Sequence, residues 1–258
     1  MRLRNRVALI TGGGRGIGRA IALAYAREGT KLVLAARTVG ELEETAREAR
    51  SLGADVFVVK ADVTVQAEVE EMVRHAVGRY STVDILVNNA GMAGPVGALP
   101  DNDVASWIRT IQVNLIGTYL CCRAVLPLLL WQNRGKIIIL SGGGGAFAWR
   151  QMSAYCATKV ALVRLAETLA LELVGKNIQV NAIRPGAIAT DGLREVIDGW
   201  RESGDTKMVA VGQRLLAGDD GDISGRLINA EDDFLDLPNR SKEITDSAAY
   251  MLRRVELS

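Results

Sequence analysis

The sequence predicts an α/β fold in which helices cover both faces of a doubly wound parallel sheet of about seven strands. Two observations predict it. Short runs rich in Val, Ile, Leu and Ala alternate with longer helical patterns through residue 183. The short runs are almost continuously apolar, as strands buried on both faces are. Because strand and helix alternate, the strands are expected to be parallel and joined by right-handed crossovers.

The elements follow in order along the chain. The expected strands are residues 6–11, 31–36, 55–60, 83–88, 135–140 and 177–183, with a last one at 225–230. The expected helices are residues 18–28, 39–52, 65–80 and 153–174. The apolar run 115–131 contains Arg123 and Pro127 and is too short for a membrane span, so we expect a buried helix at a domain or subunit contact.

Residues 1–258 are expected to form one domain, since α/β folds of this length are often single units. From residue 190 to about 224 the alternation stops, and glycines and charged residues are mixed with short amphipathic pieces. We expect this stretch to be an excursion near the substrate rather than a second domain.

Composition and charge exclude several classes of function. The 31 basic and 30 acidic residues leave a net charge of +1, so neither a nucleic acid nor an anionic membrane is an expected partner. Cys121, Cys122 and Cys156 form no disulfide framework, and no set of Cys and His has metal-ligand spacing. The N-terminal apolar stretch is too short for a signal peptide. We therefore expect a cytoplasmic protein with no bound metal.

The segment TGGGRGIGRAIA, residues 11–22, places glycines between the first strand and the first helix. Glycines let backbone N–H groups approach a pyrophosphate, because they have no Cβ. Gly12, Gly16 and Gly18 follow G-x-x-x-G-x-G rather than the common G-x-G-x-x-G. A tight connection would also use glycines. The position directly after the N-terminal strand favours a dinucleotide site of the Rossmann type.

The end of the second strand, LVLAARTVG, has no Asp or Glu to bind the ribose 2′-hydroxyl of NAD. Arg37 follows Ala36 instead, and Arg15 lies in the glycine loop. Two guanidinium groups suit a ribose 2′-phosphate, which Arg binds in a bidentate fork. NADP(H) is therefore the expected cofactor. NAD(H) is the alternative, with both arginines as solvated surface residues.

Tyr155 and Lys159 lie four residues apart at the start of a predicted helix and so share one of its faces. A free phenol has a pKa of about 10, and a neighbouring ammonium lowers that pKa by favouring the phenolate. Beside a nicotinamide, the pair predicts a proton transfer coupled to a hydride transfer at a carbonyl or carbinol carbon.

Four motifs occur in a fixed order: TGGGRGIG, NNAG at 88–91, Tyr155-x-x-x-Lys159 and RPGAIAT at 184–190. Together they resemble the short-chain dehydrogenase/reductase family over about residues 5–190. The resemblance implies a seven-stranded Rossmann-type sheet and a tyrosine acid/base. It also implies a small carbonyl or alcohol substrate, such as an oxoacyl thioester, a sugar or a small ketone, and a homotetramer or homodimer.

The resemblance also implies a role for each matching residue. Tyr155 would exchange the proton, Lys159 would lower its pKa and bind the nicotinamide ribose, and Asn114 would hold a water in the proton relay. With the two arginines added, the expected cofactor contacts besides Tyr155 and Lys159 are Gly12, Arg15, Gly16, Ile17, Gly18, Arg37, Asp62, Val63, Asn89, Ala90, Gly91, Pro185, Gly186, Ile188 and Thr190.

The chain departs from the family at the catalytic serine, which normally stands thirteen residues before the tyrosine. That position is Gly142, and Ser141 is one residue earlier. A pliable loop would let the Ser141 hydroxyl reach the site, so Ser141 is the fourth catalytic candidate. Otherwise Ser141 only ends the strand, and water or backbone N–H groups orient the substrate. The missing serine also leaves open an alternative function, a nucleotide-binding sensor or scaffold that has lost catalysis.

Two further segments are candidates for substrate or subunit contacts. Trp149, Gln151 and Met152 precede the tyrosine and line either the substrate pocket or the protein core. The C-terminal segment INAEDDFLDLPNR, residues 228–240, replaces the usual ending of the family and is expected at a subunit interface or a neighbouring pocket.

Overall fold

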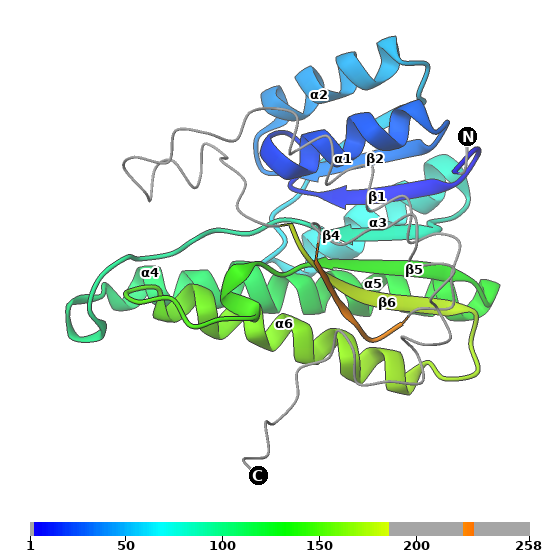
Figure 1. The fold of residues 1–258 in the computed structure, drawn as a ribbon. Coiled ribbons are helices and arrows are strands. Elements are labelled where there is room, and N and C mark those ends of the chain that lie inside the picture. The colour runs from blue at the N-terminus through cyan, green and yellow to red at the C-terminus, as the bar shows by residue number, and fades with distance from the viewer. Residues whose placement is uncertain (1–2, 186–223, 230–258) are drawn as a thin grey trace.

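The computed structural model of the chain describes residues 3–185 and 224–229. Within them, seven strands form one sheet in the order β3-β2-β1-β4-β5-β6-β7, and every neighbouring pair is parallel. Helices lie on both faces of this sheet (Figure 1). The predicted fold class is therefore confirmed.

The strands lie within two residues of the predicted ranges. They are β1 (Val7–Thr11), β2 (Lys31–Ala36), β3 (Val56–Lys60), β4 (Ile85–Asn88), β5 (Gly135–Leu140), β6 (Ile178–Arg184) and β7 (Leu227–Asn229). The four predicted helices are α1 (Gly16–Arg27), α2 (Val39–Ser51), α3 (Gln66–Tyr80) and α6 (Ser153–Glu172).

The buried helix predicted at 115–131 is the end of a longer one. From Val104 to Gln132 the chain is continuously helical, as α4 (Val104–Ile111), a π-helical turn η2 (Gln112–Ile116) and α5 (Gly117–Gln132). By length and composition alone this helix could cross a membrane. Leu120, Val125 and Leu129 are buried in the protein core, which accounts for its apolar inner face.

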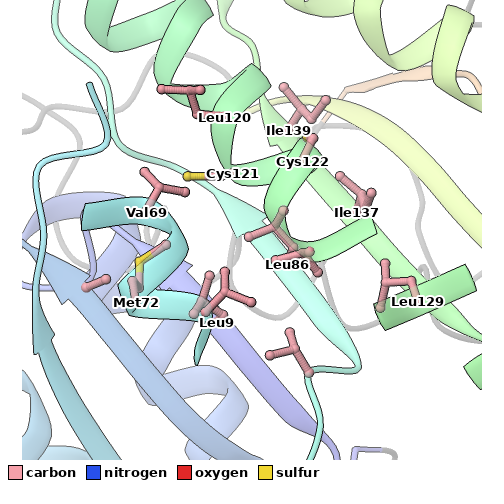
Figure 2. Close-up of a cluster of buried hydrophobic side chains, with 14 of the residues drawn as sticks. Leu9, Val69, Met72, Leu86, Leu120, Cys121, Cys122, Leu129, Ile137 and Ile139 are labelled. Carbon is pink, nitrogen blue, oxygen red and sulfur yellow. The ribbon is translucent and has the colours of Figure 1, made fainter. Parts of the chain in front are cut away.

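Two apolar layers enclose the sheet because the strand side chains alternate between its faces. One layer joins the strands to α1 and α2, and the other joins them to α3, α5 and α6. Figure 2 shows the second layer. There Leu9, Leu86 and Ile137 of the sheet lie among Met72 of α3 and Leu129 of α5. Both faces of the strands are thus buried, which explains their continuous apolar sequences.

The strand order places a crevice beside the carboxyl ends of β1 and β4. After β1 the chain crosses to one face of the sheet through α1, and after β4 it crosses to the other through α5. Such a reversal opens a binding site at the carboxyl edge of a parallel sheet. The predicted excursion at residues 190 to about 224 lies outside the described residues except for residue 224, and the predicted C-terminal segment 228–240 lies outside them from residue 230.

Candidate active site

A cleft of about 640 Å³ opens at this edge of the sheet. Most of the predicted cofactor residues line it: Gly12, Arg15, Gly16, Ile17, Arg37, Asp62, Val63, Asn89, Ala90 and Gly91. The sequence patterns missed the other lining residues, namely Gly14, Ala36, Thr38, Glu41, Ala61, Met92, Arg109 and Val113. Pro185 is described but does not line the cleft, and Gly186, Ile188 and Thr190 lie outside the described residues.

The glycine loop needs glycine at two positions because of its backbone. Gly12 and Gly16 have φ angles of 64° and 55°, in the left-handed region that disfavours any residue with a Cβ. The Asn89 side chain holds the loop closed, since its Nδ2 donates to the carbonyls of Thr11 at 2.9 Å and Gly12 at 3.1 Å. Asn89 therefore positions the cofactor loop as well as lining the cleft.

Gly18 was predicted as a cofactor contact, but the structure places it behind the loop. A Cβ on Gly18 would overlap the main-chain oxygen of Gly12 and would crowd Asn89 Nδ2. Gly18 does not line the cleft. Its lack of a side chain lets α1 approach the end of β1, so it shapes the site through packing.

At the far end of the cleft, Asp62 is fixed by an interaction network that the sequence did not predict. Its carboxylate accepts hydrogen bonds from Thr64 N at 2.9 Å, Thr64 Oγ1 at 2.7 Å and Arg109 Nη2 at 2.9 Å. Burial raises the pKa of Asp62, but these hydrogen bonds and the charge of Arg109 outweigh it and lower the pKa overall. Asp62 is thus held as a carboxylate acceptor facing the cleft.

Tyr155 and Lys159 lie on the first turns of α6, with the Lys159 ammonium 5.6 Å from the centre of the phenol ring. Lys159 is only 6% exposed, and its Nζ donates to the carbonyl of Leu140 at 2.8 Å. Burial lowers the pKa of Lys159 to about 8. Burial, with a smaller contribution from Cys156, raises the pKa of Tyr155 to about 12. The phenol pKa therefore shifts opposite to the predicted direction, because burial dominates.

Asn114 lies in the π-helical turn η2 and is 1% exposed. Its Oδ1 accepts from Met92 N at 2.8 Å, and its Nδ2 donates to Met92 O at 2.9 Å and to Thr158 Oγ1 at 3.0 Å. A Cβ built on Gly91 would lie 3.3 Å from Asn114 Oδ1 and 3.6 Å from Lys159 Nζ. The chain after β4, η2 and α6 therefore meet at one point. The water that Asn114 was predicted to hold stays a prediction.

Ser141 occupies a different place from the predicted one. It is 3% exposed, and its hydroxyl donates to the carbonyl of Lys159 at 2.9 Å. Ile137 and Ile139 of β5 face the layer that contains α6, and the strand alternation carries Ser141 to that same side. A one-residue shift would turn its side chain to the opposite face. Gly142 is the residue beside the tyrosine, since a Cβ there would overlap the Tyr155 hydroxyl.

The single histidine and the three cysteines of the chain are not among the predicted site residues. His75 is exposed on α3, and its Nε2 lies 2.7 Å from Glu71 Oε1. Cys121 and Cys122 are buried, and none of the three cysteines, all within the described ranges, forms a disulfide. No group of three His, Cys, Asp or Glu side chains that could hold a metal ion occurs in residues 3–185 and 224–229.

Comparisons with known proteins agree with this geometry. The family model of the short chain dehydrogenase matches residues 6–199. The chain is 38% identical to 2-(S)-hydroxypropyl-CoM dehydrogenase 3 of Xanthobacter autotrophicus, over 77% of each chain. It is 37% identical to a 3-oxoacyl-[acyl-carrier-protein] reductase of Staphylococcus epidermidis, over 72% of this chain and 77% of the relative.

Solved structures show the same fold. Levodione reductase superposes with a TM-score of 0.81 at 29% identity, covering 88% of this chain and 96% of its own. A single-residue variant of actinorhodin polyketide ketoreductase, solved with NADPH, gives a TM-score of 0.79 at 29% identity, covering 87% and 95%. With this cleft, this tyrosine–lysine pair and these relatives, the chain belongs to the short-chain dehydrogenase/reductase family and is an oxidoreductase that acts on CH–OH groups with NAD(P).

Proposed function

We propose that this chain is an NADP(H)-dependent oxidoreductase that interconverts a carbonyl compound and the corresponding secondary alcohol, with Tyr155 as the acid/base. The observation that carries the proposal is the placement of Lys159 on α6, with its Nζ 3.6 Å from a Cβ built on Gly91, which also lines the dinucleotide cleft. Tyr155 lies one turn earlier on the same helix. Proton transfer and cofactor binding are thereby brought to one edge of the sheet.

The residues of the cleft fit a dinucleotide. Gly12 and Gly16 line it at the N-terminus of α1, where backbone N–H groups favour a pyrophosphate. Near the reacting groups, a side chain at Gly91 would fill the space next to Asn114 and Lys159. A nicotinamide cofactor supplies or accepts a hydride at the carbonyl carbon of the substrate.

Tyr155 and Lys159 then carry the proton chemistry. With a pKa of about 12, the phenol is protonated at neutral pH and can donate its proton to the carbonyl oxygen as the new C–H bond forms. With a pKa of about 8, Lys159 is largely an ammonium at neutral pH and stabilises the phenolate that results. In the oxidation direction the same proton returns from the alcohol to Tyr155.

The preference for NADP(H) rests on Arg15 and Arg37. Both line the cleft, and neither makes an ion pair or side-chain hydrogen bond with any residue that the structure describes. Changing both to Ala should weaken NADPH binding by roughly 10- to 100-fold, since charge-assisted bonds to a phosphate are lost, and should leave NADH binding almost unchanged. Arg47→Ala, on the exposed side of α2, is the matched control. Equal losses for NADPH and NADH would refute the preference.

The proposal of a substrate class is supported by the relatives, which include the two enzymes above and a sepiapterin reductase of Chlorobaculum tepidum that is 37% identical over 71% of this chain and 78% of its own. We propose a substrate among oxoacyl thioesters, sugars and small ketones or their alcohols. The test is oxidation of NADPH over such a panel by the wild type and Tyr155→Phe. The variant should lose activity to below a few percent and keep its NADPH affinity.

Two outcomes would count against the proposal. Activity of Tyr155→Phe above a few percent of wild type would exclude Tyr155 as the acid/base. No turnover across the panel, together with tight NADPH binding, would favour a nucleotide sensor of the same fold. The observation behind that second candidate is Ser141, whose hydroxyl is bonded to the Lys159 carbonyl.

We further propose that the chain assembles as a homotetramer or homodimer. The outward face of the helix 104–132 carries exposed apolar side chains, among them Val104, Tyr119 and Trp131, the last 84% exposed. Large exposed apolar patches mark interaction surfaces. Light scattering of wild type and Trp131→Glu tests this. A monomeric wild type would refute it.

A further inference from the structure

We infer that Trp149 is a positioning residue for Tyr155, and that Gly143 is the residue that lets the indole reach its place. The two rings are stacked, with centroids 5.7 Å apart and an angle of 18° between their planes. The inference rests on the proposed function, because it takes Tyr155 as the acid/base.

The orientation of the phenol depends on packing. The Tyr155 hydroxyl makes no hydrogen bond with any residue in the described part of the chain, and Gly142 stands where the family places a serine. The ring is instead enclosed by the Gly142–Gly144 backbone, the Trp149 indole and the Lys159 ammonium. The orientation of the Tyr155 hydroxyl is therefore set by the packing of these neighbouring groups around the ring.

The glycines are required by these contacts. A Cβ on Gly142 would overlap the Tyr155 hydroxyl, and one on Gly143 would overlap the six-membered ring of Trp149. A Cβ on Gly144 would lie 2.9 Å from Cδ1 of Tyr155. None of the three glycines has a φ in the left-handed region, so an alanine could adopt the same backbone. What a side chain would change here is the position of the two aromatic rings.

The loop that carries the indole is itself fixed. Trp149 N donates to Cys156 Sγ on α6 at 3.4 Å, and Gln151 O accepts from Gly97 N at 2.9 Å. Met152, which follows, is buried. Trp149 therefore stacks on Tyr155 from a loop that is tied to the same helix and to the segment before α4.

The consequence is a specific kinetic effect. Without the indole, the phenol gains orientations in which its hydroxyl no longer points at the substrate oxygen. Misplacing a reacting group by about 1 Å costs on the order of 100-fold in rate. We therefore expect the turnover number to fall, while NADPH affinity and KM stay close to wild type, since the stack does not line the cofactor cleft.

Four variants test this with the best substrate of the panel. Trp149→Ala should lower kcat by at least about tenfold, and Trp149→Phe, which keeps a stacking ring, should recover most of it. Phe147→Ala is the matched control, because Phe147 lies in the same loop, is 63% exposed and packs on Arg184 instead. Its kcat should stay within about twofold of wild type. Gly143→Ala should lower kcat as much as Trp149→Ala does, although the tryptophan itself is kept.

A double-mutant cycle separates positioning from general destabilisation. If Gly143 acts through the indole, Gly143→Ala combined with Trp149→Ala should be no worse than Trp149→Ala alone. Gly78→Ala controls for the added methyl, since nothing lies within 4 Å of a Cβ at Gly78. Tyrosine-selective NMR tests the same coupling without substrate, because it measures how fast the Tyr155 ring flips. Ring flipping should be faster in Trp149→Ala and Gly143→Ala and should stay slow in Phe147→Ala.

The results separate the inference from the proposed function. Wild-type kcat in Trp149→Ala, no recovery in Trp149→Phe, or additive losses in the cycle would each overturn the positioning role. If Tyr155→Phe is inactive in the same assay, the proposed function stands in all three cases. Retained activity in Tyr155→Phe would instead refute the proposed function.

Discussion

Two glycine-rich turns meet at the active site, and their glycines serve different physical needs. After β1, Gly12 and Gly16 adopt left-handed φ angles, and a Cβ on Gly18 would collide with the main chain of Gly12. After β5, Gly142 and its neighbours have ordinary backbone angles, and the obstacles to a Cβ are the side chains of Tyr155 and Trp149. The first turn is constrained by its own backbone and the second by its neighbours. Substitutions should therefore be tolerated differently in the two turns.

The largest effect is expected in the first turn, for Gly18→Ala. Because main-chain atoms cannot move aside, the new methyl should push α1 away from the loop and weaken NADPH binding by about 100-fold or more, in line with ~3 kcal/mol for overpacking. Cofactor titration by fluorescence measures this. Gly40→Ala, where nothing lies within 4 Å, is the control. Wild-type affinity in Gly18→Ala would mean that α1 has room to adjust.

In the second turn, Gly142→Ser restores the serine of the family at its usual position. The new side chain would overlap the Tyr155 hydroxyl, so we expect kcat to fall by roughly 100-fold through misplacement of the phenol. NADPH affinity should stay within about twofold of wild type, because the cleft is untouched. Steady-state kinetics with both variants would sharpen the contrast. A gain in kcat would show that the phenol can make room for a serine.

The charge of Lys159 gives a pH-dependent prediction. Its pKa is about 8 in the fold against a reference of 10.5, so the unfolded chain holds the extra proton between these values and stability rises with pH across that window. Lys159→Met removes the buried charge and should stabilise the protein near pH 7 by up to about 3 kcal/mol, an advantage that fades toward pH 10. Urea unfolding at several pH values measures it. A pH-independent difference would contradict the assignment.

The smallest effect is expected for Arg109→Ala at the end of the cleft that contains Asp62. Arg109 is 35% exposed, so the loss of its bond to Asp62 should weaken NADPH binding by only about two- to fivefold. Thr64 would still hold the other carboxylate oxygen. Arg123→Ala, which removes a surface ion pair on α5, is the matched control and should leave affinity unchanged. An effect of Arg109→Ala as large as that of Gly18→Ala would show that Asp62 dominates binding.

The sequence predicted the sheet well because its strands are buried on both faces and therefore read as continuous apolar runs. It missed α4. The apolar residues Val104 and Ile108 of this helix are exposed, so the apolar pattern there does not indicate a helix face packed against the core. One local signal was present: Asp103 caps this helix by accepting a hydrogen bond from Ser106 N at 2.6 Å. Arg109 and its contact with Asp62 were missed together with the helix that carries them.

At the candidate site, the sequence carried more information about the helix face of Tyr155 and Lys159 than about their environment. The spacing of Tyr155 and Lys159 predicted their shared helix face, but it carried no information about how deeply each is buried, and burial sets both pKa values. For Ser141 the information was in the sequence, since the alternation of β5 assigns it to the side of Ile137 and Ile139. The shifted-loop hypothesis would have required breaking that alternation.

The π-helical turn η2 has a consequence for how this chain tolerates insertions and deletions. A π turn holds one more residue than an α turn, because its hydrogen bonds reach five residues instead of four. Deleting a single residue between Gln112 and Ile116 would let the helix become regular while α4 and α5 keep nearly the same faces, because the π turn already holds one residue more than an α turn. A one-residue deletion inside α5 would instead rotate the chain before it by about 100° around the helix axis, which would carry Asn114 away from Thr158 and turn a different face of α4 to α6. The π turn is therefore the place in this long helix where a one-residue change in length disturbs the packing of the flanking helices least.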